Sequence, residues 1–216
     1  MDITYLGHSS FRLRGKYASL ITDPYIESEV GLKFPKVSAD IVTVSHEHPD
    51  HNNVEAVKDI KKDIRGAGEY EISGISIIGI PTFHDDKKGT LRGKNTVYII
   101  EDGDLRLVHL GDIGHKLSEG VLEEIGVIDV MMIPVGGVYT IGPSDAAEIV
   151  REIEPSIVIP MHYQVPGLRK DTFEKLAQVD EFLKEVGLGV ERLDKLSVKK
   201  SDLLEEHKVV VLEKKS

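Results

Sequence analysis

The amino-acid sequence predicts an α/β protein in which β-sheets are stacked together and helices lie outside them. The first observation is a series of short runs rich in Ile and Val, bounded by turn residues, which is typical of buried strands. The second is that helical patterns fall between the later runs, an order that suits a layered arrangement. The third is the length of 216 residues, of which 40% are hydrophobic. That is enough for one full-sized core, or for one domain made of two similar halves.

Seven apolar runs are expected to form strands, because each combines β-branched residues with flanking turn residues. The expected strands cover residues 17–22, 41–44, 75–80, 96–100, 105–110, 128–133 and 157–159. The first six residues of the chain also have a strand-like pattern. The abundance of Ile and Val favours strands that are buried on both faces.

Two longer helices are expected in the second half of the chain. The segment 143–154 repeats apolar residues at helical spacing, with one proline at its first position and another directly after its end. The segment 171–186 is expected to form a second helix. Asp171 and Glu174 match a capping box at its start, and Gly187 matches a C-terminal cap.

The composition limits the classes of function. The chain has 27 Lys and Arg against 37 Asp and Glu, a net charge of -10, which argues against a nucleic-acid partner bound through phosphates. It has no cysteine, so His and carboxylates must carry any metal chemistry. No apolar run approaches the roughly 20 residues of a membrane span, and the N-terminus lacks the basic start of a secretory signal. We therefore expect a cytoplasmic protein with no membrane partner, and homo-oligomer formation is left open.

A dense group of metal-binding residue types follows the expected strand 41–44. The segment 45–51 contains three His and one Asp, namely His46, His48, Asp50 and His51. With alternate spacing, the first two His can reach one ion, while the following Asp and His can turn toward a neighbouring ion. A mixed set of imidazole and carboxylate ligands suits Zn, Fe or Mn. A short helix is expected over 53–60, directly after this group.

Three further candidate ligands each follow an expected strand. His84 lies just beyond the run 75–80, Asp112 follows the run 105–110, and His162 follows the run 157–159. Open α/β sheets place their sites at the carboxyl ends of strands. The repeated position therefore predicts that these three side chains join the 45–51 segment in one metal site.

The order H-x-H-x-D-H, then a His, then Gly-Asp, then a final His after a strand resembles the metallo-β-lactamase superfamily. This resemblance covers nearly the whole chain. Further segments resemble the branch containing ascorbate-6-phosphate lactonase and related zinc hydrolases, namely Leu6–Phe11, Thr22–Pro24, Gly136–Pro143 and Pro160–Tyr163.

The resemblance implies one metallo-β-lactamase-like domain over residues 1–216, a four-layer αββα sandwich with two divalent ions at one edge. Zn is expected, with Mn and Fe as alternatives. By matching positions, the implied metal ligands are His46, His48 and His84 for one ion, Asp50, His51 and His162 for the second, and Asp112 as the bridge between them. Asp23 matches an Asp that orients the ligand loop without binding metal. The chain departs from the pattern in the highly charged stretch 85–93 after His84, which could turn that His away from the site.

Other polar residues near these segments have less specific interpretations. His8, Tyr139 and Tyr163 are candidates for contact with substrate, with turn capping or core contacts as the alternatives. His109 lies within a strand and is expected to be a hydrogen-bonded core residue, whereas His115 is expected at the surface. The Gly136-Gly137 pair is interpreted as a tight turn and not as a phosphate-binding loop.

The predicted activity is hydrolysis of a small molecule with a lactone or ester carbonyl, by a hydroxide that bridges the two ions. The catalytic residues are expected to be Asp112, as the bridge, and Asp50, which would orient the water. The main alternative is a phosphodiesterase or nuclease of the same superfamily. A di-iron oxidoreductase is disfavoured because His48 stands where such proteins carry a Glu, and a non-catalytic binding protein is disfavoured because all seven ligand positions are filled.

Overall fold

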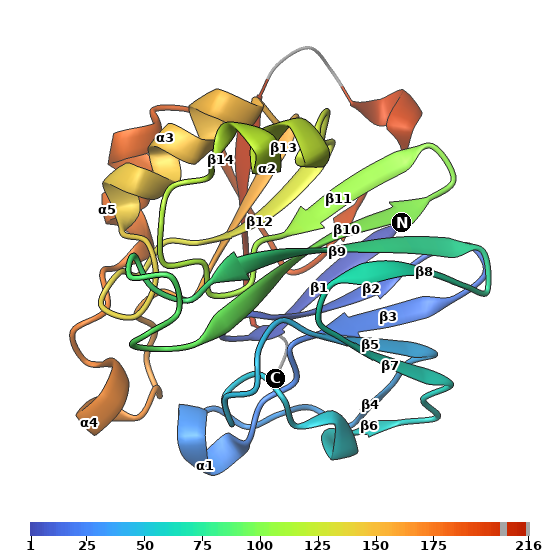
Figure 1. The fold of residues 1–216 in the computed structure, drawn as a ribbon, viewed down its shortest axis with the longest axis horizontal. Coiled ribbons are helices and arrows are strands. Elements are labelled where there is room, and N and C mark those ends of the chain that lie inside the picture. The colour runs from blue at the N-terminus through green and yellow to red at the C-terminus, as the bar shows by residue number, and fades with distance from the viewer. Residues whose placement is uncertain (204–206, 215–216) are drawn as a thin grey trace.

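The computed structural model describes residues 1–203 and 207–214 and consists of two large sheets with short helices (Figure 1). The smaller sheet contains β1 (Asp2–Gly7), β2 (Ser10–Arg14), β3 (Ser19–Thr22), β5 (Ile41–Val44), β7 (Lys62–Arg65) and β15 (Leu196–Ser197). Its strand order is β15-β1-β2-β3-β5-β7. The pairs from β15 to β3 are antiparallel, and β3, β5 and β7 are parallel.

The larger sheet repeats this plan of antiparallel strands followed by parallel ones. Its strands are β8 (Gly68–Ile72), β9 (Ile75–Phe83), β10 (Lys94–Asp102), β11 (Leu105–His109), β12 (Val130–Pro134), β13 (Ile157–Met161), β14 (Gly189–Leu193) and β16 (Lys208–Leu212). The order is β14-β16-β13-β12-β11-β10-β9-β8. The pairs from β8 to β11 are antiparallel and the rest are parallel.

The main core lies between the two sheets. Inward residues of both sheets form one buried cluster that includes Ile3, Phe11, Leu107 and Ile159. The hydroxyl of the buried Tyr98 donates a hydrogen bond to the backbone oxygen of Val44, 2.9 Å away, and so joins the larger sheet to the smaller one. Burial of alternate residues on β1 and β2 follows from the two-residue period of a strand.

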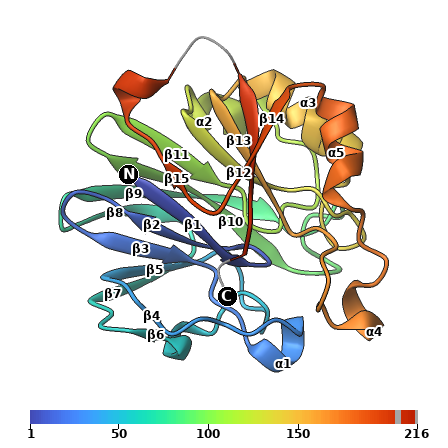
Figure 2. The ribbon, with the colours of Figure 1, turned by 180° about the vertical axis from the view of Figure 1, so that it is seen from behind.

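The outer layers of the sandwich differ. Helices α2 (Glu119–Ile125), α3 (Pro143–Ile153) and α5 (Val179–Val186) cover the larger sheet and enclose a second apolar cluster (Figure 1). The smaller sheet is covered only in part, by α1 (Glu27–Val30), a 3-10 turn at Val54–Ala56 and the ribbon of β4 (Val37–Ser38) and β6 (Val57–Lys58) (Figure 2). This two-sheet architecture confirms the predicted fold class, with a thin outer layer over the smaller sheet.

Two of the predicted helices are wrong. Residues 53–60 form the 3-10 turn and then β6, because Val57 pairs with Val37 in a short parallel ribbon. Residues 171–186 are divided into α4 (Lys170–Phe173) and α5. The observed capping box belongs to Gln178 and Glu181, not to the predicted pair seven residues earlier. The predicted Gly187 cap is confirmed, with a left-handed backbone.

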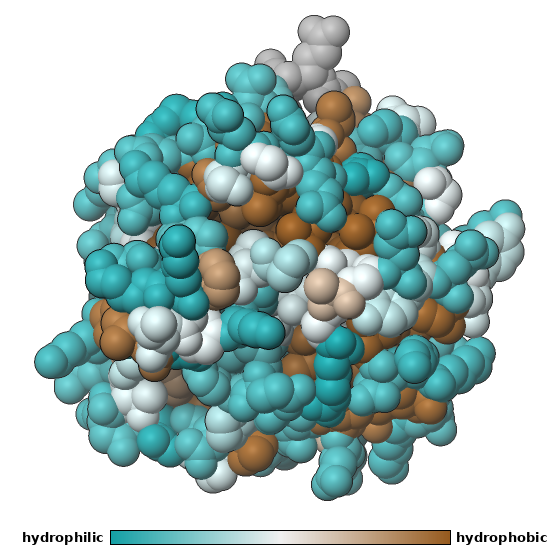
Figure 3. Space-filling view, viewed as in Figure 1, coloured by the Kyte–Doolittle hydropathy of each residue, from teal (hydrophilic) through white to brown (hydrophobic). Residues whose placement is uncertain are grey.

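The exposed surface agrees with the charged composition. Hydrophilic residues cover most of the face shown in Figure 3, and apolar residues reach the surface in patches between them. In the described part of the chain, none of the helices has the length and apolar character needed to cross a membrane.

Candidate metal centre

Six strands end at the edge that carries the predicted ligands. In the smaller sheet β1, β3 and β5 run in one direction, and in the larger sheet β9, β11 and β13 do the same. Strands that share a direction end at the same edge of their sheet. The polar residues that follow these six strand ends are His8, Asp23, the segment 45–51, His84, Asp112 and His162.

Three His from two strand ends form the first ligand group. One ring nitrogen each of His46, His48 and His84 lies within 4.8 Å of the others. The ring centroids of His46 and His84 are 4.6 Å apart, and those of His46 and His48 are 4.7 Å apart. The three imidazoles therefore face a common point, as ligands of one ion must.

The second ligand group contains one more residue than the resemblance implies. Ligand atoms of Asp50, His51 and His162 lie within 4.8 Å of one another, and His8 belongs to the same group. The His8 Nε2 atom is 3.3 Å from Asp50 Oδ2, and its ring centroid is 4.2 Å from that of His162. His8 thus lines this site, one of the two interpretations that its sequence position allows.

Asp112 lies between the two groups. Its Oδ2 atom is 3.2 Å from the Nε2 atoms of both His51 and His162, and 3.6 Å from the Nε2 of His84. The first two His belong to the second group, and His84 belongs to the first. A single carboxylate oxygen is therefore within reach of both groups, which is the geometry that a bridging ligand requires.

Asp23 supports both groups through hydrogen bonds. It is fully buried, and its two oxygens accept hydrogen bonds from Ser45 N at 2.7 Å, Ser45 Oγ at 2.6 Å and His51 Nδ1 at 2.9 Å. Because the Ser45 hydroxyl proton points to Asp23, Ser45 Oγ accepts the Nδ1 proton of His46, 2.9 Å away. Both imidazoles are thereby fixed with the Nε2 lone pair directed into the site.

The electrostatic environment affects the candidate ligands in different ways. Burial alone would lower the pKa of His51, but Asp112 and Asp50 raise it well above its ordinary value. Burial lowers the pKa of His46 well below its ordinary value, and the nearby His51 lowers it further. Burial alone would raise the pKa of Asp112, but His162 and His51 hold it well below its ordinary value. A neutral imidazole and an ionised carboxylate are the forms that coordinate a divalent ion.

Several buried polar atoms at this site make no hydrogen bond with the described residues. They are His8 Nδ1, His46 Nε2, His51 Nε2, His84 Nδ1, Asp112 Oδ1 and both ring nitrogens of His162. Leaving a buried polar atom unsatisfied costs about 1–3 kcal/mol, so a cluster of them points to partners other than protein atoms. Imidazole nitrogens and carboxylate oxygens suit Zn, Mn or Fe, and the residues therefore fit divalent metal ions.

The charged stretch after His84 folds around one carboxylate. Asp85 accepts hydrogen bonds from four backbone amides, those of Lys87, Gly89, Leu91 and Arg92, at 2.7–3.0 Å. The His84 amide also bonds to the Gly93 oxygen, 3.1 Å away, which closes the loop. His84 is consequently buried, with 3% of its surface exposed, and points into the site.

We expect Asp85→Ala to weaken metal binding on the order of tenfold, because the loop that holds His84 would lose four hydrogen bonds to the two Asp85 oxygens. Burial raises the pKa of Asp85, but the amides outweigh it and lower the pKa to about 2. Since this value lies below that of the unfolded state, the stabilisation is complete above about pH 4 and is lost as the pH falls toward 2. Amide hydrogen exchange over 87–92 measures the loop order. Unchanged exchange in the variant would contradict this role.

Asn95 and Gly111 place Asp112, and the sequence patterns did not single out either residue. The buried Asn95 amide group donates to Thr82 Oγ1 and to the Leu110 oxygen, and its Oδ1 accepts the Asp112 amide at 2.9 Å. Gly111 has a φ of +57°, and a Cβ there would lie 2.3 Å from Asn95 Oδ1. The one available signal was a polar Asn directly before the expected strand 96–100.

The backbone is strained where the strands deliver their ligands. His8, Asp23 and His162 all have positive φ angles, of 56°, 40° and 51°. Such angles are uncommon for residues other than glycine and persist where the surrounding structure holds them. Gly136 permits another close approach, since a Cβ there would lie 2.1 Å from the His162 oxygen. The turn itself follows this pair, where the Thr140 amide bonds to the Gly137 oxygen at 3.4 Å.

Two other histidines have structural hydrogen bonds. His109 is fully buried, with Nε2 2.9 Å from the Ser9 oxygen and Nδ1 accepting the Gly111 amide, so the predicted core role is confirmed. His115 is half-buried, and its Nε2 accepts the Phe83 amide at 3.2 Å. It therefore supports the residue before His84.

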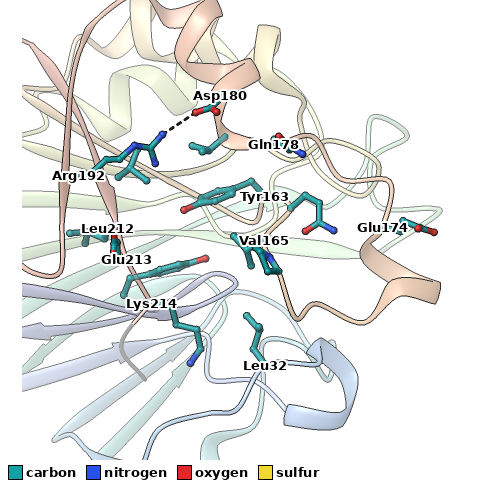
Figure 4. Close-up of a pocket in the computed structure, with 15 residues that line it drawn as sticks. Leu32, Tyr163, Val165, Glu174, Gln178, Asp180, Arg192, Leu212, Glu213 and Lys214 are labelled. Carbon is teal, nitrogen blue, oxygen red and sulfur yellow. Dashed lines mark hydrogen bonds and ion pairs between the residues drawn. The ribbon is translucent and has the colours of Figure 1, made fainter.

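The two tyrosines proposed to contact substrate lie in different surroundings. The Tyr139 hydroxyl donates to the Thr172 oxygen, 2.8 Å away, and its ring lies beside Phe173, which contacts His8. Tyr163 lines a separate pocket of about 780 Å³ with the Arg192–Asp180 ion pair (Figure 4). That pocket contains none of the seven predicted ligands, so its size alone does not mark it as the active site.

The fold and this site define a class of metal-binding hydrolases, and sequence comparison assigns the chain to it. A model of the beta-lactamase superfamily domain matches residues 2–162. The chain therefore belongs to the beta-lactamase superfamily and is a metal-dependent hydrolase of the metallo-β-lactamase type.

Curated relatives and solved structures agree with this assignment. A UPF0173 metal-dependent hydrolase of Symbiobacterium thermophilum is 31% identical, over 84% of this chain and 92% of the relative. Another, from Methanopyrus kandleri, is 28% identical over 88% of this chain and 95% of the relative. A crystal structure from Thermotoga maritima, of a candidate Zn-dependent hydrolase of the metallo-beta-lactamase superfamily, has 38% identity and a TM-score of 0.81, covering 98% of this chain and 97% of the other.

Proposed function

We propose that this hydrolase cleaves a small molecule at a lactone or ester carbonyl, using two divalent ions held by the seven predicted ligands. The observation that carries the proposal is the position of Asp112 Oδ2, which lies within 3.6 Å of ring nitrogens from both ligand groups. The resemblance to the lactonase-containing branch supports the carbonyl substrate. Zinc as the native metal, a single domain over 1–216 and a cytoplasmic location remain part of this proposal.

The residues at the site have distinct roles in this reaction. Bound divalent ions would activate water for attack and stabilise negative charge on the substrate oxygen. The Asp50 side chain is 21% exposed, whereas that of Asp112 is 2% exposed, so Asp50 is the carboxylate that a water in the cleft can reach. Asp50 therefore accepts a hydrogen bond from that water and orients it, while His8 holds the Asp50 oxygen in place.

Metal content tests the proposal directly. We expect about two ions of Zn, Mn or Fe per chain by elemental analysis of protein purified without chelator, since two groups share one carboxylate. We also expect a bound pair to raise the thermal unfolding temperature, because ions that bind only the folded state stabilise it. A stoichiometry near one after supplementation with each metal would replace the dinuclear site with a mononuclear one.

A phosphodiester substrate is the alternative, and one observation favours it. A pocket of about 610 Å³ beside His46 and His48 is also lined by Arg92 and Lys94, neither of which has a carboxylate within ion-pair distance in the described ranges. Two such cations would attract a negatively charged group. Side-by-side turnover of a nitrophenyl ester and of bis(nitrophenyl) phosphate separates the two functions. Faster cleavage of the phosphodiester would overturn the carbonyl proposal.

A further inference from the structure

The outer face of β1 and β2 is open, and it carries positive charge. On these strands Ile3, Tyr5, Phe11 and Leu13 point into the core between the sheets. Because side chains alternate along a strand, the intervening residues point outward. Thr4 pairs with Arg12 and Asp2 pairs with Arg14 across the two strands, so both arginines project from this face.

A groove of about 820 Å³ runs along this face and is lined by six basic residues. They come from β2, from the segment between α1 and β4, from the turn before β15, and from the chain beyond β16, elements that can be followed in Figure 2. The six are Arg12, Arg14, Lys33, Lys36, Lys195 and Lys214. Asp2 is the one acidic residue among the described residues that line the groove.

The acidic residue does not neutralise this cluster. Asp2 forms an ion pair with Lys195 at 3.0 Å and accepts a hydrogen bond from Ser197 Oγ. Within residues 1–203 and 207–214, Arg12, Arg14, Lys33 and Lys36 have no carboxylate within ion-pair distance. The Nε atom of Arg12 is buried and has no hydrogen-bond partner in that same part of the chain.

Such a cluster is unfavourable without a counter-ion. Like charges in one groove repel each other, and burial together with Arg14 lowers the pKa of Arg12. The chain has ten more acidic than basic residues, so carboxylates able to pair with these cations are abundant elsewhere on its surface. Unpaired cations gathered on an acidic protein therefore indicate an anionic ligand.

We propose that this groove binds a compact polyanion, a small molecule that carries two or more phosphate groups. Arginine forks match phosphate oxygens in pairs, and the lysines add charge around them. A long polyanion would extend beyond the groove onto an acidic surface and be repelled. Aromatic side chains, on which nucleic-acid bases would stack, are absent from the described lining of the groove. None of the seven predicted metal ligands lines the groove, so the site is separate from the metal centre.

The test is calorimetric titration of the whole protein with inorganic tripolyphosphate at low salt. Two double variants, Arg12→Met with Arg14→Met and Lys33→Met with Lys36→Met, should each weaken binding at least about tenfold, since each removes two charges from the groove. The lysine pair is exposed on a loop, so that variant tests the proposal even if the strand variant unfolds. The matched control is Lys175→Met with Lys184→Met, which removes the same charge from exposed positions outside the groove.

Tripolyphosphate bound at the metal centre would contribute equally to all variants, so the difference between each double variant and the control reports the groove alone. Tricarballylate tests whether carboxylates serve as well as phosphates, and equal affinity would overturn the assignment to phosphate. A single-stranded oligothymidylate of about 20 nucleotides tests for an extended ligand, and tighter binding than tripolyphosphate would overturn the compact one. An equal loss of affinity in the control variant, or no measurable binding by the wild-type chain, would overturn the site itself.

Discussion

Replacing Asp112 by Ala is expected to remove the metal and to lower kcat/KM on the order of 1000-fold. The reason is its position, since one Asp112 oxygen lies within 3.6 Å of ring nitrogens from both ligand groups. Loss of this carboxylate separates the two groups and leaves their histidines without the charge that draws cations to the site. Elemental analysis gives the metal content, and thermal unfolding of the metal-free protein shows whether the variant is folded.

Asp129→Ala is the matched control for this experiment. Asp129 is also a buried carboxylate, but it precedes β12 at the opposite edge of the sheet, where it accepts the Arg106 amide and pairs with Lys200. Its replacement should lower the unfolding temperature and leave the metal content unchanged. If Asp112→Ala kept both ions and full turnover, the bridging role would be wrong.

The strands that could be predicted from the sequence are buried ones. The run 41–44 coincides with β5, and the run 75–80 is the start of β9, because both are rich in apolar β-branched residues. Strands β2 and β16 were missed although their residues are mostly buried. The edge strands β7, β8 and β14 were also not predicted. They are mostly exposed and carry residues such as Lys62, Glu69 and Glu191, as edge strands do to avoid pairing with other chains. Their positions depend on neighbouring strands and not on their own hydrophobicity.

The error over 171–186 has a tertiary cause. The local pattern favoured Asp171 and Glu174, because Gln178 is not a residue type that usually begins a capping box. Between α4 and α5, the Ala177 amide bonds to the Gly136 oxygen and the Ala177 oxygen accepts the Gln164 amide. These contacts come from loops distant in sequence and break the helix between Phe173 and Val179.

The candidate ligands could be predicted because each follows the end of a strand. The residues that hold these ligands in place could not be predicted. His46, His84 and His162 are metal-binding residue types in a repeated position, and the structure brings them to one edge. Asn95 and Asp85 act on backbone amides that come together only in the folded chain. No spacing in the sequence indicates such contacts, because each joins residues that a single helix or strand would not bring together.

Asp23→Asn is expected to weaken metal binding by about 10–100-fold while preserving the volume of the side chain. Asp23 Oδ2 accepts hydrogen bonds from both Ser45 Oγ and His51 Nδ1. An amide nitrogen at that position donates instead, so the Ser45 hydroxyl must turn and His51 must accept at Nδ1. The proton of His51 then moves to Nε2, the atom that faces Asp112 at 3.2 Å, and a protonated nitrogen cannot bind metal.

The tautomer of His51 can be measured separately from metal affinity. A purely structural role of Asp23 would not change it. Nitrogen NMR of the zinc-loaded protein should show the His51 proton on Nδ1 in the wild type, whereas Asp23→Asn titrated with zinc should keep the proton on Nε2. The control is Asp40→Asn, which removes a carboxylate that accepts Ser19 N and Oγ and pairs with Lys61 just before β5, away from the metal site. It should cost stability without changing His51 or the metal content. A wild-type tautomer and full metal affinity in Asp23→Asn would show that Asp23 does not fix the orientation of this ligand.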